Sequence, residues 1–229
     1  EAGVRKFPPR KVIAIPFTPS DEELSAYKQL DAFLERRKAE LKKAKVSDMA
    51  TLLLKKRFLS SPLAFAYTVD NYLAARGLSI EDAPDYDEVL GERADDQEEG
   101  LIEQDEAIAL RAGIGAGLEL NKTDQNALNQ LSKWGRGFLG KPDSRLQALL
   151  DYLNKTLRND VNEINDERIV IFSEYVDTIN WIKSMLESNG FGEDRVAVII
   201  GSTDSDDREQ IKAQFQADPS EQALRILLA

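Results

Sequence analysis

A glycine followed by two hydroxyl residues, Gly201-Ser202-Thr203, separates the apolar run 195–200 from an expected helix over 206–216. Backbone N–H groups at such a strand-to-helix turn can hold a phosphate group. Three aspartates follow within the next few residues; they repel phosphate, although they suit the positive end of a helix. The turn therefore has two interpretations: its hydroxyl groups only cap the helix, or they cap it and the turn also contacts a phosphate backbone.

The chain contains neither histidine nor cysteine. This excludes disulfides and thiolate nucleophiles, and it removes the commonest general base and the commonest metal ligand. Any catalysis would have to use carboxylates, lysine, arginine or serine.

Gly135, Gly140 and Lys141 have the spacing of a nucleotide-binding phosphate loop. Such a loop follows a strand, and a hydroxyl group after the lysine holds magnesium. Here a helical segment precedes the glycines and Pro142 stands where the hydroxyl should be. We therefore interpret 135–142 as a hinge and not as a nucleotide site.

Ser173 and the cluster 55–57 are further candidates for binding, and Arg208 is a candidate for a structural role. Ser173 ends an apolar run at the edge of the expected sheet where ligands bind, and either contacts a ligand or forms a plain turn. Arg208 lies one turn into the helix after the glycine turn, and we predict a structural ion pair with Asp204 or with acidic residues of a neighbouring element. The basic cluster 55–57 either meets phosphate or forms a solvated helix face.

Apolar and amphipathic segments alternate after residue 141. Strands are predicted over 168–172, 195–200 and 224–229, with helices over 176–188 and 206–216 between them. Apolar strands that alternate with helices indicate parallel βαβ units. The predicted fold class is α/β: a helical N-terminal half followed by an incomplete RecA-like parallel β-sheet flanked by helices.

The first 140 residues divide into three segments by composition. Residues 1–18 form the first segment, and a lead-in strand is predicted within it over 10–18. Helices fill 19–76, the first with a capping box formed by Ser20 and Glu23. Residues 77–140 are expected to form an acidic linker with a short helix after Thr123, and 141–229 form the α/β part.

The net charge of −11 comes almost entirely from one stretch, 79–106, which holds thirteen acidic residues and one basic residue. The rest of the chain is nearly neutral, so the acidity does not exclude a DNA partner. Dense like charge with few apolar groups predicts that 79–100 is mobile. The sequence has no apolar run long enough to span a membrane and opens on no signal peptide, so we expect a cytoplasmic protein without a membrane partner.

The α/β part resembles the second RecA-like lobe of Snf2-type ATPases of helicase superfamily 2. The pattern consists of a strand that ends Phe172-Ser173 before Tyr175, a strand that ends Gly201-Ser202-Thr203, a helix with Arg208 near its start and Phe215 near its end, and a strand of the type "RILLA". The segment "FPPRKVIAIPFTPSDEELSAYKQL" and the helices to 76 are similar to the region between the lobes. The nearest likeness is the bacterial branch related to the RNA-polymerase-associated helicase.

This resemblance implies an ATP-dependent DNA translocase or helicase in which Ser173, Gly201, Ser202 and Thr203 lie near double-stranded DNA. It also implies ATP and Mg²⁺ bound by motifs outside this sequence, a possible RNA polymerase or other protein partner, and association with the nucleoid. We therefore expect the chain to be an inactive middle piece of the motor, with an unpaired sheet edge that its own helices or a second copy cover.

Two alternatives stay open. The chain could be a non-catalytic protein-interaction domain built on a RecA-like scaffold. A flavodoxin-like or response-regulator domain is weaker, because the run "FSEY" supplies one acidic residue where such a site needs a cluster or a phosphate loop.

Overall fold

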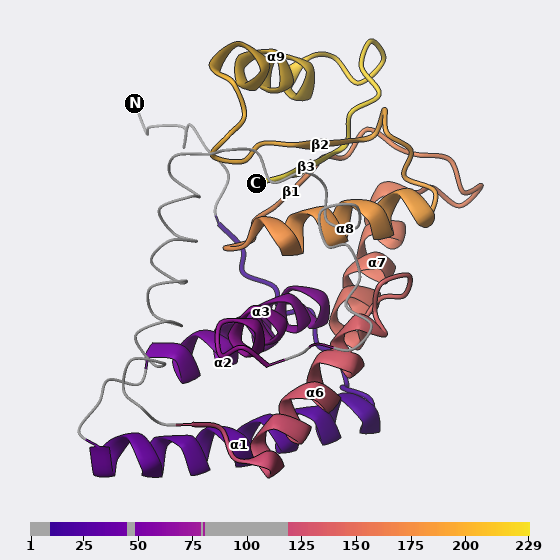
Figure 1. Cartoon of the computed structure of the whole chain (residues 1–229). Helices are drawn as coiled ribbons and strands as arrows, with labels where there is room; N and C mark the ends of the chain where they lie inside the picture. Colours follow the sequence, from indigo (N-terminus) through magenta and orange to yellow (C-terminus); the bar gives the residue numbers. More distant parts are fainter. Residues whose placement is uncertain (1–9, 45–48, 79, 81–118) are drawn as a thin grey trace, which may run out of the picture.

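The computed structural model describes residues 10–44, 49–78, 80 and 119–229 (Figure 1). The described chain is rich in α-helix and contains a small three-stranded parallel sheet flanked by helices, an α/β arrangement. Figure 1 shows helix α9 (Ser205–Gln216) on one side of the sheet and helix α8 (Val176–Ser188) on the other. The helical N-terminal region lies beyond α8. The stretch 79–100, for which the sequence predicts mobility, lies outside the described residues apart from Ile80.

Among the described residues, four helices make up the helical region: α1 (Asp21–Ala44), α2 (Met49–Ser60), α3 (Pro62–Ala74) and α6 (Lys122–Arg136). The predicted capping box of α1 is confirmed, because Glu23 accepts from the backbone N–H of Ser20 at 2.6 Å and the Ser20 hydroxyl accepts from that of Glu23 at 3.2 Å. The Ser61 hydroxyl caps α3 by accepting from the N–H of Ala64 at 3.2 Å, and Pro62 opens the helix. The buried face of α1 holds Leu30 and Phe33, whereas Leu24 and Tyr27 are partly exposed.

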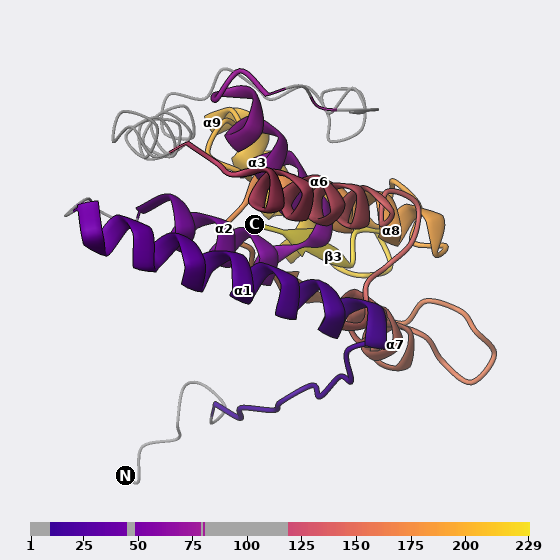
Figure 2. The same cartoon turned by 60° about the horizontal axis from the view of Figure 1, so that its bottom comes forward.

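Helix α6 corrects the predicted domain boundaries. Residues 122–136 are not a short helix in a linker; they pack along α1 and α3 and bury Leu128 and Leu131 (Figure 2). A Cβ atom on Gly135 would lie 2.3 Å from the carbonyl oxygen of Pro62, so only glycine allows α6 to approach α3 this closely. The buried Asp70 accepts hydrogen bonds from Ser132 and Arg136 of α6. The helical region therefore extends beyond 76 to include α6.

The α/β part follows the predicted order of elements. It contains the helices α7 (Ser144–Leu157), α8 (Val176–Ser188) and α9 (Ser205–Gln216), and the strands β1 (Ile169–Ile171), β2 (Val196–Val198) and β3 (Ile226–Leu228). Helix α7 buries Leu146, Leu150, Leu153 and Leu157, which recur every three to four residues along one face. Gly190, with φ of 83°, ends α8 in the left-handed conformation.

The strand order is β1-β3-β2, with all pairs parallel. Ile226 pairs with both Ile169 and Val196, so the "RILLA" strand lies at the centre of the described sheet and not at its edge. All three residues of β3 are buried. The strand therefore has a hydrogen-bonded neighbour on each of its two sides.

Two apolar cores stabilise the molecule. One lies among α1, α2, α3 and α6, and the other lies between the sheet and the helices α7 and α8. Trp134 packs against both cores, stacking on Phe58 with ring centres 5.2 Å apart and meeting Phe138 edge-on at 5.2 Å. The indole N–H of the buried Trp181 donates to the Phe138 carbonyl. The helical region and the α/β part thus share one continuous interior.

The lead-in strand predicted over 10–18 is not found. Residues 10–20 run extended away from α1 without pairing to any described strand (Figure 2). Their apolar side chains stay in solvent, with Val12 81% exposed and Ile13 60% exposed. A strand needs a partner for its backbone groups, and the described regions of the chain supply none here.

Candidate functional site

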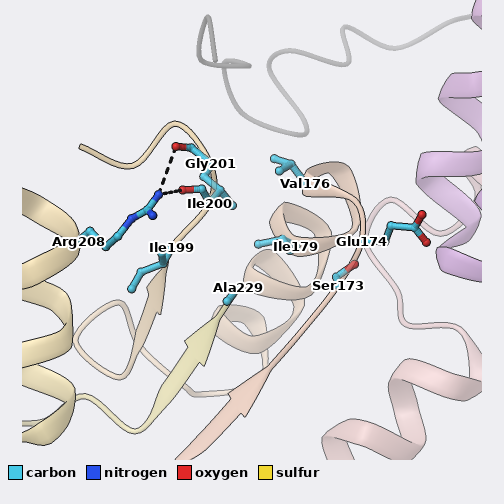
Figure 3. Close-up of a pocket in the computed structure, with 9 residues that line it drawn as sticks. All are labelled: Ser173, Glu174, Val176, Ile179, Ile199, Ile200, Gly201, Arg208 and Ala229. Carbon is cyan, nitrogen blue, oxygen red and sulfur yellow. Dashed lines mark hydrogen bonds between the residues drawn. The ribbon is translucent and has the colours of Figure 1, made fainter. Parts of the chain in front are cut away.

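An open hollow of about 330 Å³ lies at the carboxyl edge of the sheet, where all three strands end (Figure 3). Open α/β sheets bind their ligands at this edge. The lining residues come from the ends of the strands and from the starts of α8 and α9: Ser173, Glu174, Val176, Ile179, Ile199, Ile200, Gly201, Arg208 and Ala229. The sheet thus brings together two segments that the sequence singles out, one after β1 and one after β2.

On the β1 side, Ser173 lies in the hollow as predicted. Its backbone N–H donates to the carbonyl of Ala229 at 2.9 Å and extends the β1–β3 ladder. Its hydroxyl accepts from the N–H of Tyr175 at 3.3 Å, so the side chain also fixes the turn that leads into α8. The backbone therefore favours the strand-end turn, which places Ser173 at the rim of the hollow.

On the β2 side, the glycine turn is held by Thr203, whose hydroxyl accepts from the N–H of Ile200 at 2.9 Å. The prediction that the hydroxyl residues cap the next helix is wrong, because Asp204 is the cap and accepts from the N–H of Asp206 at 2.8 Å. Gly201 lines the hollow, whereas Ser202 and Thr203 do not. Within the described chain, the N–H groups of Gly201 and Ser202 have no hydrogen-bond partner.

Arg208 reaches from α9 back to this turn (Figure 3). Its guanidinium donates to the carbonyls of Ile200 at 3.0 Å and Gly201 at 3.3 Å. The predicted structural role is therefore supported by geometry, but the predicted ion pair is wrong, since the partners are backbone carbonyls. Both hydrogen bonds start from the same nitrogen, Nη2, which is shared between the two carbonyl oxygens.

The chemistry that the hollow offers is binding. Of the two N–H groups without a partner in the described chain, that of Gly201 belongs to the lining and that of Ser202 lies next to it in the turn. The Arg208 guanidinium also lines the hollow, the walls are the apolar side chains of Val176, Ile179 and Ile199, and the one lining carboxylate is Glu174. General acid and base catalysis needs two titratable groups in reach of a reacting atom, and the lining residues contain no such pair. The aspartates of the α9 start keep the outer rim acidic.

The basic cluster 55–57 is occupied by ion pairs. Lys55 lies 3.7 Å from Asp31 and Lys56 lies 3.0 Å from Glu174, with both lysines about half exposed. Arg57 is buried and lies 3.1 Å from the buried Asp177 of α8. The interpretation as a solvated helix face therefore holds for the lysines and is wrong for Arg57, which sequence reasoning missed because an arginine in a basic run is expected at the surface.

A second hollow of about 400 Å³ lies where the start of α7 meets Phe17 and Thr18. Burial raises the pKa of Asp143 at this place, despite hydrogen bonds from Leu146 and the nearby Arg145. Burial also acts to raise the pKa of Glu23, but hydrogen bonds from Ser144 and Ser20 outweigh it and lower that pKa. Glu23 therefore joins the first turns of α1 and α7, and we assign this hollow a structural role.

The phosphate-loop spacing at 135–142 carries no nucleotide site. Gly135 belongs to α6, no described strand precedes it, and the ammonium group of Lys141 lies 4.8 Å from the centre of the Phe138 ring. The rejection made from the sequence is thus supported by the contacts that these residues make.

No family model, curated protein or solved structure matches this chain. Among the described residues, no helix is both long enough and apolar enough to cross a membrane. In the same regions of the chain, no three acidic residues come close enough together to hold a metal ion.

Proposed function

We propose that the chain belongs to an ATP-dependent DNA translocase of the Snf2 type. In this proposal the helical region lies between the two motor lobes, and the α/β part is the start of the second RecA-like lobe. The observation that carries the proposal is the sheet order β1-β3-β2, which gathers the ends of β1 and β2 around one hollow at the carboxyl edge. The motif residues Ser173 and Gly201 meet there.

The hollow and the glycine turn are then the surface that faces duplex DNA. Two backbone N–H groups without a partner in the described chain, at Gly201 and Ser202, can donate to phosphate oxygens. Arg208 supports the turn from behind by binding its carbonyls. ATP and Mg²⁺ belong, in this proposal, to motifs that the 229 residues do not contain. RNA polymerase is a partner by analogy with the resembling bacterial branch, and nucleoid association follows from the DNA partner.

DNA binding by the purified chain tests this proposal. Fluorescence anisotropy with a labelled duplex at low salt should detect binding that weakens as salt rises. Ser202→Glu puts a negative charge on the turn and should weaken binding by about tenfold, since a lost charge-assisted contact is worth about 1.4 kcal/mol or more. Ser184→Glu is the matched control, because Ser184 is exposed on α8 and does not line the hollow. Equal affinities for the two variants would contradict the assignment of this surface.

ATP hydrolysis gives a second test. We expect no phosphate release from the chain, with or without duplex DNA, because its sequence lacks a phosphate loop with a magnesium-binding hydroxyl. A phosphate-release assay on the pure protein measures this. ATP turnover that disappears after a single substitution within the chain would refute the proposal that ATP is bound by motifs outside these residues.

A non-catalytic protein-interaction domain is the second candidate. The observation that favours it is the acidic start of α9, where Asp204, Asp206 and Asp207 flank the turn and repel phosphate. Absence of any salt-dependent DNA binding by the unmodified chain would support this candidate over the translocase.

A further inference from the structure

The helical region and the α/β part meet at a polar joint. We define the joint as two sets of residues: Lys56, Arg57, Ser60 and Ser61 at the α2–α3 junction, and Glu174, Tyr175, Asp177 and Thr178 at the turn between β1 and α8. The two sets lie more than a hundred residues apart in the sequence, and hydrogen bonds or ion pairs connect them.

Arg57 is the centre of the joint. Its Nη1 lies 3.1 Å from Oδ2 of Asp177, and only 6% of each side chain is exposed. Its guanidinium carbon lies 3.9 Å from the centre of the Tyr175 ring, a stacking geometry that lysine would not reproduce. A buried ion pair adds little net stability over apolar side chains of the same volume, because both charges lose their hydration. Its distinctive contribution is to fix one geometry.

Three hydroxyl groups continue the joint. The oxygens of Ser60 and Thr178 lie 2.7 Å apart, and Thr178 donates to Ser61 at 3.0 Å. Ser61 also accepts from the N–H of Ala64 as the cap of α3. The residue that begins α3 therefore also binds the first turn of α8. Shifting α3 would break a contact with α8, and shifting α8 would disturb the cap of α3.

The same turn also forms one wall of the hollow. Ser173, Val176 and Ile179 line the hollow, whereas Tyr175, Asp177 and Thr178 contact the helical region. Figure 3 shows Glu174 pointing away from the sheet, toward the helical region, where Lys56 binds it. One side of a short turn thus faces the candidate ligand, and the other side is held by α2 and α3.

We propose that Arg57 is a positioning residue for the hollow: through Tyr175 and Asp177, the helical region sets the conformation of the β1–α8 turn that a ligand meets. Any ligand that needs this conformation is coupled to the helical region, and the coupling acts equally in both directions. The portion of this inference that concerns DNA rests on the proposed function. The positioning itself does not.

The test separates positioning from mere stability by a pair of variants. Arg57→Met leaves Asp177 buried without its arginine and should destabilise the fold. The double variant Arg57→Met/Asp177→Leu removes both charges and should recover much of the melting temperature. If Arg57 positions the turn, amide hydrogen exchange at Tyr175, Thr178 and Ile179 should stay at least about tenfold faster than in the unmodified protein, even in the recovered double variant. Its affinity for duplex DNA should stay weakened by about fivefold or more.

Arg36→Met is the control, since it also takes an arginine from a buried carboxylate, Asp124, but within the helical region and from a partly exposed position. It should lower the melting temperature, but amide exchange in the β1–α8 turn should speed up no more than exchange in the rest of the protein. The inference would be overturned if, in every variant, the amide-exchange rate in the turn changed only as much as global stability predicts. If the unmodified chain binds no DNA, the proposed function fails, and the exchange data alone decide: locally faster exchange supports positioning, and unchanged exchange refutes it.

Discussion

The two edges of the sheet are built in opposite ways. At the amino edge, an arginine directly precedes each strand, and all three arginines donate to backbone carbonyls of the loops that lead into the strands. At the carboxyl edge, the strands end around an open hollow, and Arg208 supports only one of its turns. The amino edge is closed by protein groups, and the carboxyl edge leaves donors for a ligand. In an open α/β sheet this is the division expected between a structural edge and a binding edge.

Arg225 and Arg195 at the amino edge differ in burial and in the number of carbonyls that they bind. The side chain of Arg225 is 4% exposed and donates to four carbonyl oxygens, those of Asn165, Pro219, Gln222 and Leu224. Arg195 at the same edge is about a third exposed and binds one carbonyl, that of Ala223. The comparison therefore predicts unequal effects of the same substitution at this edge.

The largest effect is expected for Arg225→Met. The substitution removes a buried guanidinium that donates to four carbonyls, one of them in a buried and three in a partly buried hydrogen bond, and we expect the free energy of unfolding to fall by about 3 to 5 kcal/mol. Urea unfolding followed by circular dichroism measures it. Arg195→Met is the control at the same edge and should cost about 1 kcal/mol or less, because water replaces a partly exposed donor. Equal losses would show that burial does not distinguish the two arginines.

A smaller effect is expected at the open edge. Arg208→Met removes two hydrogen bonds to the carbonyls of Ile200 and Gly201, and the carbonyls can turn to water, so the loss should be about 1 to 2 kcal/mol. Lys212→Met on the same helix removes only an exposed pair with Glu209 and should cost less than about 0.5 kcal/mol. If Arg208→Met destabilises as strongly as Arg225→Met, the contrast between the edges is wrong.

The sequence predicted the elements of the α/β part well, because apolar runs and helical periodicity are local signals. The bounds of α8 agree with the prediction at both ends, and the strands are shorter than predicted by one to two residues at each end. The central place of β3 was not predicted, since three equally apolar runs give no strand order. That order follows from how the connecting helices pack.

The buried charges were the main failure of sequence reasoning. Arg57, Asp70, Asp124 and Arg225 are buried because partners 60 or more residues away, or loop carbonyls, satisfy them. Helix α6 was assigned to a linker for the same reason: its partners Asp70 and Arg36 lie in distant helices. One signal was present and was overlooked, namely an arginine within the first two residues of each predicted strand, which directly precedes the observed strand. A charge repeated at the same place in three strands indicates a shared structural task.

The smallest expected effect is a dependence of stability on pH. It tests whether the arginines at the sheet edges stabilise the fold independently of pH, unlike the carboxylates elsewhere. Arginines stay protonated throughout the accessible range, so the loss caused by Arg225→Met should be similar at about pH 7 and about pH 4. Glu23 behaves otherwise, because its pKa in the folded protein is lowered by the hydrogen bonds from Ser144 and Ser20, which outweigh the effect of burial. A carboxylate with a lowered pKa stabilises the fold above its unfolded pKa, and this contribution is lost as pH falls through the folded pKa.

Glu23→Gln should therefore lower the free energy of unfolding by less than about 1 kcal/mol at neutral pH, since the group is partly exposed, and the difference from the unmodified protein should shrink in acid. Asp143→Asn is the control of opposite sign. Burial raises the pKa of Asp143, so ionisation costs stability at neutral pH and protonation in acid removes that cost. As the pH falls, the free energy of unfolding of the unmodified protein should therefore rise relative to that of Asp143→Asn. Over the same range it should fall relative to that of Glu23→Gln. Urea unfolding of the three proteins across this range measures both trends, and parallel trends for the two variants would show that the two carboxylates do not have opposite environments.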